Sequence, residues 1–193
     1  MKISVPANLF AAVWNARSFE ETRYYLNGIH FEPGCMVATD GHILTAARIE
    51  YDGPHVILPA SKKAYAAAKG KKATSVQWDG SILSIIDANG ATLHMEPCKP
   101  IDGIFPDWRR ILPSGDLAPT GATFLASVLT AMLEAAKCHG GAAGYTMRGA
   151  DSLSPHLVTY EGEEPVFSVA MPARPGVRPI AVDVVPAWAK TPE

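Results

Sequence analysis

Short apolar runs separated by turn dipeptides recur along this chain, and this pattern restricts its fold more than any other feature. The runs at residues 74–78, 81–86 and 91–98 are joined by Asp79-Gly80 and Asn89-Gly90. Asp-Gly and Asn-Gly between apolar runs are strong local signals for a β-hairpin. The three runs are therefore predicted to be consecutive antiparallel strands.

These strands complete a larger unit that starts with one strand and one helix. Residues 55–58 are predicted to form a strand, and the alanine-rich residues 59–69 a helix that ends at Gly70, because glycine favours helix C-termini. The same order of elements recurs with a period of roughly 55–65 residues, judged from hydrophobic periodicity. The first copy has a strand at 2–5, a helix at 6–17 and strands at 24–32, 35–38 and 43–49, and the third has a helix at 123–138 and strands at 143–148, 156–161 and 166–171.

Repeated units of this kind predict an α+β fold in which the helices lie on one face of antiparallel sheets. Apolar residues make up 48% of the 193 residues, which is enough for a packed core. We expect one domain at residues 1–98, a linker at 99–118 that is rich in proline and glycine, and a half-sized domain at 119–174. The tail at 175–193 contains four prolines and is expected to lie outside the fold.

Charge and hydropathy exclude several classes of protein. The net charge of −2 argues against wrapping nucleic acid with the whole surface, although it allows a local basic strip. No apolar run approaches the about 18 residues that a membrane-spanning helix needs, and the N-terminus is a poor signal peptide. We therefore expect a cytoplasmic protein without a membrane association.

The sequence shows no motif for a metal, a cofactor or a nucleotide. Cys35, Cys98 and Cys138 have no CxxC spacing and are predicted to be inert thiols in a reducing compartment. Cys138 and His139 are adjacent and cannot easily hold one ion together. Neither a GxGxxG nor a GxxxxGK motif is present. We expect no metal and no cofactor.

Four strings resemble, in their order along the chain, the bacterial DNA polymerase III β sliding clamp, the ring that tethers DNA polymerase to its template. The most specific are residues 37–44 (VATDGHIL) and 101–113 (IDGIFPDWRRILP). The other two are residues 23–28 (RYYLNG) and 171–174 (MPAR). The resemblance implies a DNA-clamp fold, with sheets outside and helices inside.

The resemblance also assigns parts of the chain to clamp domains. Residues 1–98 resemble the middle domain, and residues 101–113 resemble the linker into the last domain. Residues 119–174 have room for one unit, which looks most like the second half of the last domain; a match to its first half stays open. With 193 residues, the chain is roughly half a clamp protomer and amounts to about one and a half clamp domains.

In the clamp family, the cleft between the middle and last domains binds short linear motifs of polymerases and repair proteins. The resemblance carries that role to eleven positions, which combine apolar side chains with a few polar ones. They are Leu26, Thr39, Gly41, His42, Leu44, Pro106, Arg110, Ile111, Met171, Pro172 and Arg174. One position departs from the family, because Ile43 stands where an Arg usually follows the His.

The chemistry of this set suits a peptide with an apolar anchor. Leu44 and Met171 offer apolar area worth about 25 cal/mol per Å² buried, and methionine adapts to varied ligands. Gly41 would let a peptide approach the backbone. Arg110 and Arg174 can reach peptide carbonyls or an acidic flank.

A basic cluster accompanies the second predicted helix. In a clamp the helices line the DNA channel, so the resemblance implies weak contacts to the phosphates of double-stranded DNA without reading of bases; a solvated helix face is the plain alternative. The residues concerned are Lys62, Lys63, Lys69, Lys71, Lys72 and, on the first helix, Arg17.

The resemblance therefore implies a non-enzymatic, sliding-clamp-like accessory protein of DNA replication that binds polymerase and clamp-loader subunits through linear motifs. A normal clamp ring holds twelve units, so three units per chain would need a homo-oligomer of four copies, closed head to tail. One alternative is a non-ring adaptor or decoy that sequesters the same partners. A less favoured alternative is a hydrolase that uses Asp40 and His42, although no nucleophile lies in an elbow motif.

Overall fold

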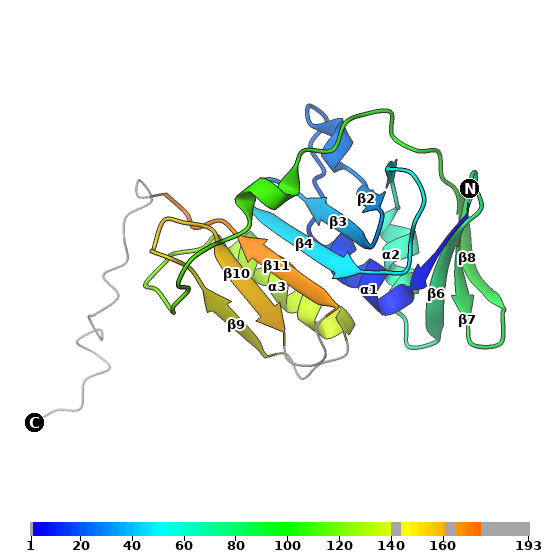
Figure 1. Cartoon of the computed structure of the whole chain (residues 1–193). Coiled ribbons are helices and arrows are strands. Elements are labelled where there is room, and N and C mark those ends of the chain that lie inside the picture. The colour runs from blue at the N-terminus through cyan, green and yellow to red at the C-terminus, as the bar shows by residue number, and fades with distance from the viewer. Residues whose placement is uncertain (1, 140–143, 161–164, 175–193) are drawn as a thin grey trace, which may run out of the picture.

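The computed structural model describes residues 2–139, 144–160 and 165–174, and within these ranges it contains two antiparallel sheets and three α-helices. The tail at 175–193, Ala143 at the start of one predicted strand and Glu161 at the end of another lie outside the described residues. The helices lie together on one side of the larger sheet (Figure 1).

The larger sheet has seven strands in the order β5-β2-β3-β4-β11-β10-β9. It joins the first unit to the third, because β4 pairs along its length with β11. The tight turns at Pro33-Gly34 and Asp40-Gly41 connect β2, β3 and β4, and both glycines have positive φ. The strands are β2 (Ile29–Glu32), β3 (Cys35–Thr39), β4 (Ile43–Arg48), β5 (Val56–Leu58), β9 (Tyr145–Arg148), β10 (His156–Tyr160) and β11 (Val166–Ala170).

The smaller sheet has four strands in the order β1-β6-β7-β8. The first two units exchange their leading strands: β1 (Ile3–Pro6) joins β6 (Ala73–Trp78), and β5 of the second unit joins β2 of the first. β7 (Ile82–Asp87) and β8 (Thr92–Pro97) complete the sheet through the two predicted hairpins. This exchange joins the two units, so that each sheet contains strands of both.

The main core lies between the helices and the inner faces of the sheets. Helix α1 (Ala7–Trp14) is almost wholly buried and contacts both α2 (Lys62–Ala68) and α3 (Ala126–His139). Phe10 is fully buried at its centre. The predicted arrangement, with the helices on one side of antiparallel sheets, is therefore confirmed.

The linker after β8 crosses over the seven-stranded sheet on the side opposite the helices (Figure 1). It contains a short 3-10 helix, η2 (Trp108–Ile111), and Trp108 is buried against the sheet. Residues 108–110 therefore adopt a helical turn within the linker. No helix in the described parts of the chain has the length and hydrophobicity that crossing a membrane requires.

Several predicted elements are shorter than expected, among them the helix predicted at 59–69, which spans Lys62–Ala68. The strand predicted from residue 24 begins at Ile29, because Leu26 N and Asn27 N donate to Arg23 O and Tyr24 O and form the 3-10 turn η1 (Tyr24–Leu26). The helix predicted to reach residue 17 ends at Trp14, where i to i−3 hydrogen bonds close the last turn. The predicted limits of the domains at 1–98 and 119–174 stay predictions, since the larger sheet runs across them.

Candidate functional site

The tight turn between β3 and β4 places the first group of predicted site residues. The Asp40 carboxylate accepts hydrogen bonds from His42 N at 2.8 Å and Ile43 N at 2.9 Å. Thr39 Oγ1 donates to Ile43 O at 2.7 Å and accepts from Gly41 N at 3.1 Å. Gly41 has a φ of +92°, which explains why glycine is needed here. Thr39 therefore builds the turn, while Gly41 and His42 are exposed on it.

Alternation along β4 separates the residues that follow the turn. Leu44 is fully buried in a second apolar cluster, on the side of the sheet away from the helices. Ile43, which replaces the family's usual Arg, points the other way into the main core and is 2% exposed. The side chain at position 43 therefore packs in the main core.

The second cluster, which we call the outer cluster, gathers residues from four distant parts of the chain. Leu26 from η1 is buried in it, and Ile111 from η2 packs against its edge. Its buried members are Leu26, Val37, Leu44, Ala46, Ile57, Phe105, Trp108 and Val169.

Pairing of β4 with β11 brings residues 171–174 next to the turn between β3 and β4. Val169 is the register partner of Leu44, and Met171 N donates to His42 O at 2.8 Å. Met171 and Pro172 are half-buried. Residues from all four strings, which are far apart in sequence, thus meet along the outer side of the β4–β11 joint.

The linker adds a pocket beside this joint. Arg110 and Ile111 line a cavity of about 270 Å³ together with residues 112–114 of the linker and Ala150, Ser154 and Pro155 of the third unit. Pro106 and Arg174 are exposed at the surface. Sequence reasoning missed Val169, Ala150, Ser154 and Pro155. Val169 carried a usable signal because it precedes the MPAR string by two positions, whereas the other three carried none.

The geometry gives no support to catalysis by Asp40 and His42. The Asp40 carboxylate is occupied by two backbone N–H groups of its own turn. The adjacent Thr39 hydroxyl is buried and donates to a backbone carbonyl. A catalytic triad requires a base that is oriented by the carboxylate and bonded to a nucleophile, and the turn provides neither relation.

The lysines of the basic cluster around α2 differ in whether they form an ion pair. Lys62, Lys63, Lys71 and Lys72 are exposed. Lys69 forms an ion pair with Glu134 of α3, which also pairs with Lys137. The pair raises the pKa of Lys69 and lowers the pKa of Glu134.

Arg17 is half-buried. Its guanidinium lies over the rings of Trp14 and Phe19, at 4.3 and 4.1 Å from their centroids, and donates to Asn27 O at 3.1 Å. Burial lowers its pKa to about 10, so it remains charged near neutral pH. We leave Arg17 out of any proposed DNA-contacting surface because its guanidinium is half-buried against two aromatic rings.

Comparisons with known proteins identify the fold. A scan against protein-family models and a search of curated proteins gave no match. The DnaN sliding clamp (DNA polymerase III subunit beta) from Bartonella birtlesii has a TM-score of 0.64 at 19% identity, and the match covers 90% of this chain and 66% of that one. The corresponding clamp from Pseudomonas aeruginosa has a TM-score of 0.62 at 18% identity, with coverages of 90% and 65%.

A third structure, the β sliding clamp of C. crescentus, has a TM-score of 0.58 at 22% identity and coverages of 90% and 66%. This chain therefore spans about 66% of the length of its structural neighbours. The DNA-clamp fold implied by the four strings is confirmed.

Proposed function

We propose that this chain is a non-enzymatic, sliding-clamp-like accessory protein of DNA replication that binds linear peptide motifs of polymerase or clamp-loader subunits. The observation that carries the proposal is the convergence of the 26–44, 106–111 and 171–174 segments beside the β4–β11 joint. These are the segments through which the chain resembles the peptide-binding cleft of clamps. The clamp fold supplies the framework on which such a cleft occurs.

The chemistry of the joint suits a peptide with one apolar anchor. The half-buried Met171 and Ile111 present apolar surface on top of a rigid, fully buried layer that includes Leu44. Ligand sites of this type are mostly apolar, with a few polar groups at the rim. His42 and Arg110 are exposed and can supply that rim.

Titration calorimetry with a clamp-motif peptide tests the proposal. We expect micromolar affinity, about −8 kcal/mol. The Met171→Asp variant should lose binding, because the bound peptide would cover a carboxylate that has no partner. Leu44→Asp is a poor test because Leu44 is wholly buried and the variant would unfold.

The matched control is Met95→Asp. Met95 lies on β8 of the other sheet and is 62% exposed, so this variant makes the same chemical change away from the joint and should bind peptide normally. Griselimycin, which is bound in the structures of the B. birtlesii and P. aeruginosa clamps, is an independent probe. Equal peptide binding by wild type and Met171→Asp would contradict the proposed cleft.

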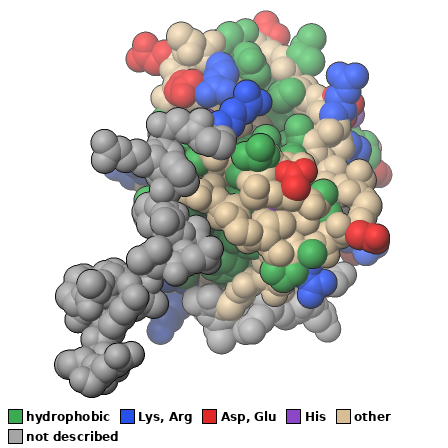
Figure 2. Space-filling model, turned by 90° about the vertical axis from the view of Figure 1, so that its left-hand side faces the viewer, with side chains coloured by type: hydrophobic (Ala, Val, Ile, Leu, Met, Phe, Trp, Pro, Cys, Tyr) green, Lys and Arg blue, Asp and Glu red, His purple; other side chains and the backbone are tan. Residues whose placement is uncertain are grey.

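We further propose that copies of the chain assemble head to tail into a ring around DNA. The support is that β8 and β9 end their sheets at opposite ends of the molecule (Figure 1), each with one free edge among the described residues. β8 exposes Leu93 and Met95, and β9 exposes Tyr145. At the end that carries β9, charged side chains lie mostly toward the rim (Figure 2). A non-ring adaptor with the same cleft is the competing version, and the mass of the particle in solution separates the two.

A further inference from the structure

Three side chains that can bind a metal meet at the edge of the seven-stranded sheet. His30 and Glu32 lie two residues apart on β2, so they point to the same side. His55 directly precedes β5, the strand that pairs with β2. One potential ligand atom from each of the two histidines and the carboxylate lies within 4.8 Å of the other two.

Two of the three separations between these atoms match a tetrahedral metal site, and the third is slightly longer. His30 Nε2 lies 3.3 Å from His55 Nδ1 and 3.5 Å from Glu32 Oε2, and His55 Nδ1 lies 3.8 Å from the same oxygen. Ligand bonds of about 2.0–2.1 Å to Zn²⁺ at tetrahedral angles place neighbouring ligand atoms about 3.3–3.5 Å apart. A small contraction would bring all three atoms into coordinating distance.

The carboxylate of Glu32 is oriented by neighbours that leave one oxygen for a metal. Oε1 accepts from Trp108 Nε1 at 3.1 Å and Cys35 Sγ at 3.0 Å, and it forms an ion pair with Arg109 at 2.6 Å. Oε2 faces the two histidines. Burial alone would raise the pKa of Glu32, but the hydrogen bonds from Arg109, Cys35 and Trp108 outweigh it and lower the pKa to about 2. The carboxylate is therefore ionised, as a ligand must be.

The ring of His30 is likewise fixed. It is 5% exposed and stacks parallel on Phe105 of the linker, with 4.7 Å between ring centroids. Its Nδ1 is buried without a hydrogen-bond partner among the described residues, so packing sets the orientation of the ring and aims Nε2 at the other two ligands. Burial lowers the pKa of His30 and favours the neutral form that binds metals.

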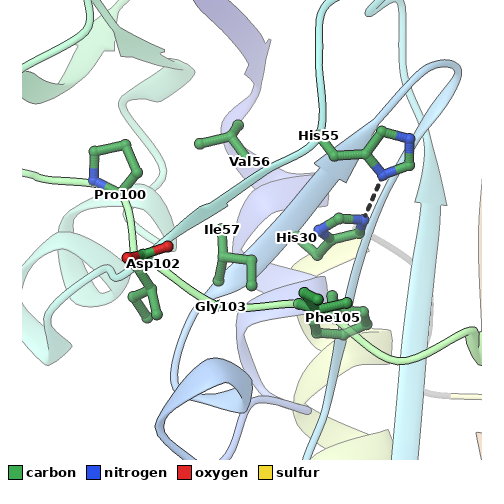
Figure 3. Close-up of a pocket in the computed structure, with 10 residues that line it drawn as sticks. His30, His55, Val56, Ile57, Pro100, Asp102, Gly103 and Phe105 are labelled. Atoms are coloured by element: carbon green, nitrogen blue, oxygen red, sulfur yellow. Dashed lines mark hydrogen bonds between the residues drawn. The ribbon is translucent and has the colours of Figure 1, made fainter.

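A cavity opens beside the two histidines. It has a volume of about 420 Å³ and is lined by His30, His55, Val56, Ile57 and the linker residues 100–105. Figure 3 shows the two imidazoles together at one end of this pocket and Asp102 at the other, so we do not count Asp102 as a ligand. The cavity leaves room for water or an exogenous ligand at a fourth coordination position.

We propose that His30, Glu32 and His55 form a binding site for a divalent first-row transition ion of the Zn²⁺ type, with an open fourth position. This site differs from the expectation of no metal, and it shares no residue with the set proposed to bind peptide. A bound ion would tie the segment before β5 to β2 and, through Trp108 and Arg109, to η2 of the linker. It would therefore help to hold the linker against the edge of the sheet.

Titration of the full-length protein with Zn²⁺, without a histidine tag, tests the assignment. We expect one ion per chain. His55→Ala removes a ligand whose side chain is 66% exposed, so the variant should keep its fold. Its affinity should fall by more than about 100-fold, the upper range for loss of an outer-shell partner. Co²⁺ in place of Zn²⁺ should give the strong visible absorption of a four-coordinate site in wild type only.

The control is His94→Ala. His94 and Glu96 also lie two apart on a strand, with His94 Nε2 3.0 Å from Glu96 Oε2, but no third ligand joins them among the described residues. This variant should bind Zn²⁺ as wild type does, and Zn²⁺ should raise the melting temperature of both but not of His55→Ala. Absence of Zn²⁺ binding by wild type, equal binding by His55→Ala, or loss of binding in His94→Ala would overturn the assignment.

Discussion

A chain of three hydroxyl groups crosses the joint between the first and third units. Ser168 Oγ on β11 lies 2.7 Å from Thr45 Oγ1 on β4 and 2.6 Å from the Tyr160 hydroxyl on β10. Thr45 and Ser168 are fully buried. Buried hydroxyls without partners are costly, so the three side chains depend on one another, and they support the strand pairing that positions Met171.

Ser168→Ala should destabilise the protein by about 1–3 kcal/mol, because it leaves two buried hydroxyls without their shared partner. Urea unfolding followed by circular dichroism measures this free energy. Adding Thr45→Val to Ser168→Ala should cost less than the two single changes together, since the second change removes a group that the first left unpaired. Strict additivity would show that the hydroxyls are independent.

Tyr160 makes the stability of the protein depend on pH in the alkaline range. Burial raises its pKa to about 12, although the bond to Ser168 opposes that shift. In the unfolded chain a tyrosine ionises near pH 10. The stability that wild type has over Tyr160→Phe should therefore be complete below about pH 10 and be lost as pH rises towards 12. Urea unfolding of both proteins between pH 8 and 12 checks this, and a constant difference would contradict it.

Among the elements, helix α1 holds the core together. It packs between α2 and α3 and also contacts β1, β3, β4 and β6. Trp14 at its end donates from Nε1 to Ala60 O at 2.9 Å and stacks on Tyr65 of α2 at 4.2 Å. A short helix in this position joins both sheets to all the helices that the structure describes.

Phe10→Ala should therefore lower the free energy of unfolding by about 3–5 kcal/mol, the range for removing a buried phenylalanine. Phe19→Ala is the matched control: Phe19 is 58% exposed and meets Trp14 edge to face, so its loss should cost about 1 kcal/mol or less. Urea unfolding of the two variants gives both values. Similar costs would mean that α1 does not dominate the core.

At the scale of the whole molecule, the property to be tested is the proposed assembly of four copies into a ring. Light scattering should give four times the 20.6 kDa of one chain if the proposed ring forms. Met95→Asp should then reduce the mass to that of a smaller species, because the carboxylate would lie in the β8 edge contact, while Met171→Asp should leave the mass unchanged. A wild-type monomer would favour the adaptor version.

DNA binding should depend steeply on salt and little on base sequence. Changing Lys63, Lys71 and Lys72 to Glu should abolish binding to linear duplex at low salt and leave peptide binding intact. If all three lysines contact phosphates in wild type, its log–log salt slope should be about −2 to −3. Fluorescence anisotropy at several salt concentrations measures the slope. Lys69 is not included because its change would also break the pair with Glu134. Unaltered binding by the triple variant would exclude this surface.

Local features of the sequence determined most of the elements. The Asp-Gly and Asn-Gly turns, the alternating apolar runs and the helical spacing depend on contacts within a few residues, so the strands and helices could be located from the sequence, although the helices predicted at 6–17 and 59–69 are shorter than expected. Residues 24–26 and 108–110 adopt 3-10 turns, and both carry a side chain, Leu26 or Trp108, that is buried against the sheet. Their conformation follows from packing, which local patterns do not contain.

Only the tertiary structure decided how distant segments meet. The pairing of β4 with β11 joins Thr45 to Ser168 across 123 residues, and no local signal specifies it. The same is true of the capture of Arg17 between two rings and of the meeting of His55 with His30 and Glu32. Such contacts depend on the complementarity of surfaces that exist only once the sheets have formed. The chain therefore determines its elements residue by residue, whereas its sites arise from the way those elements pack.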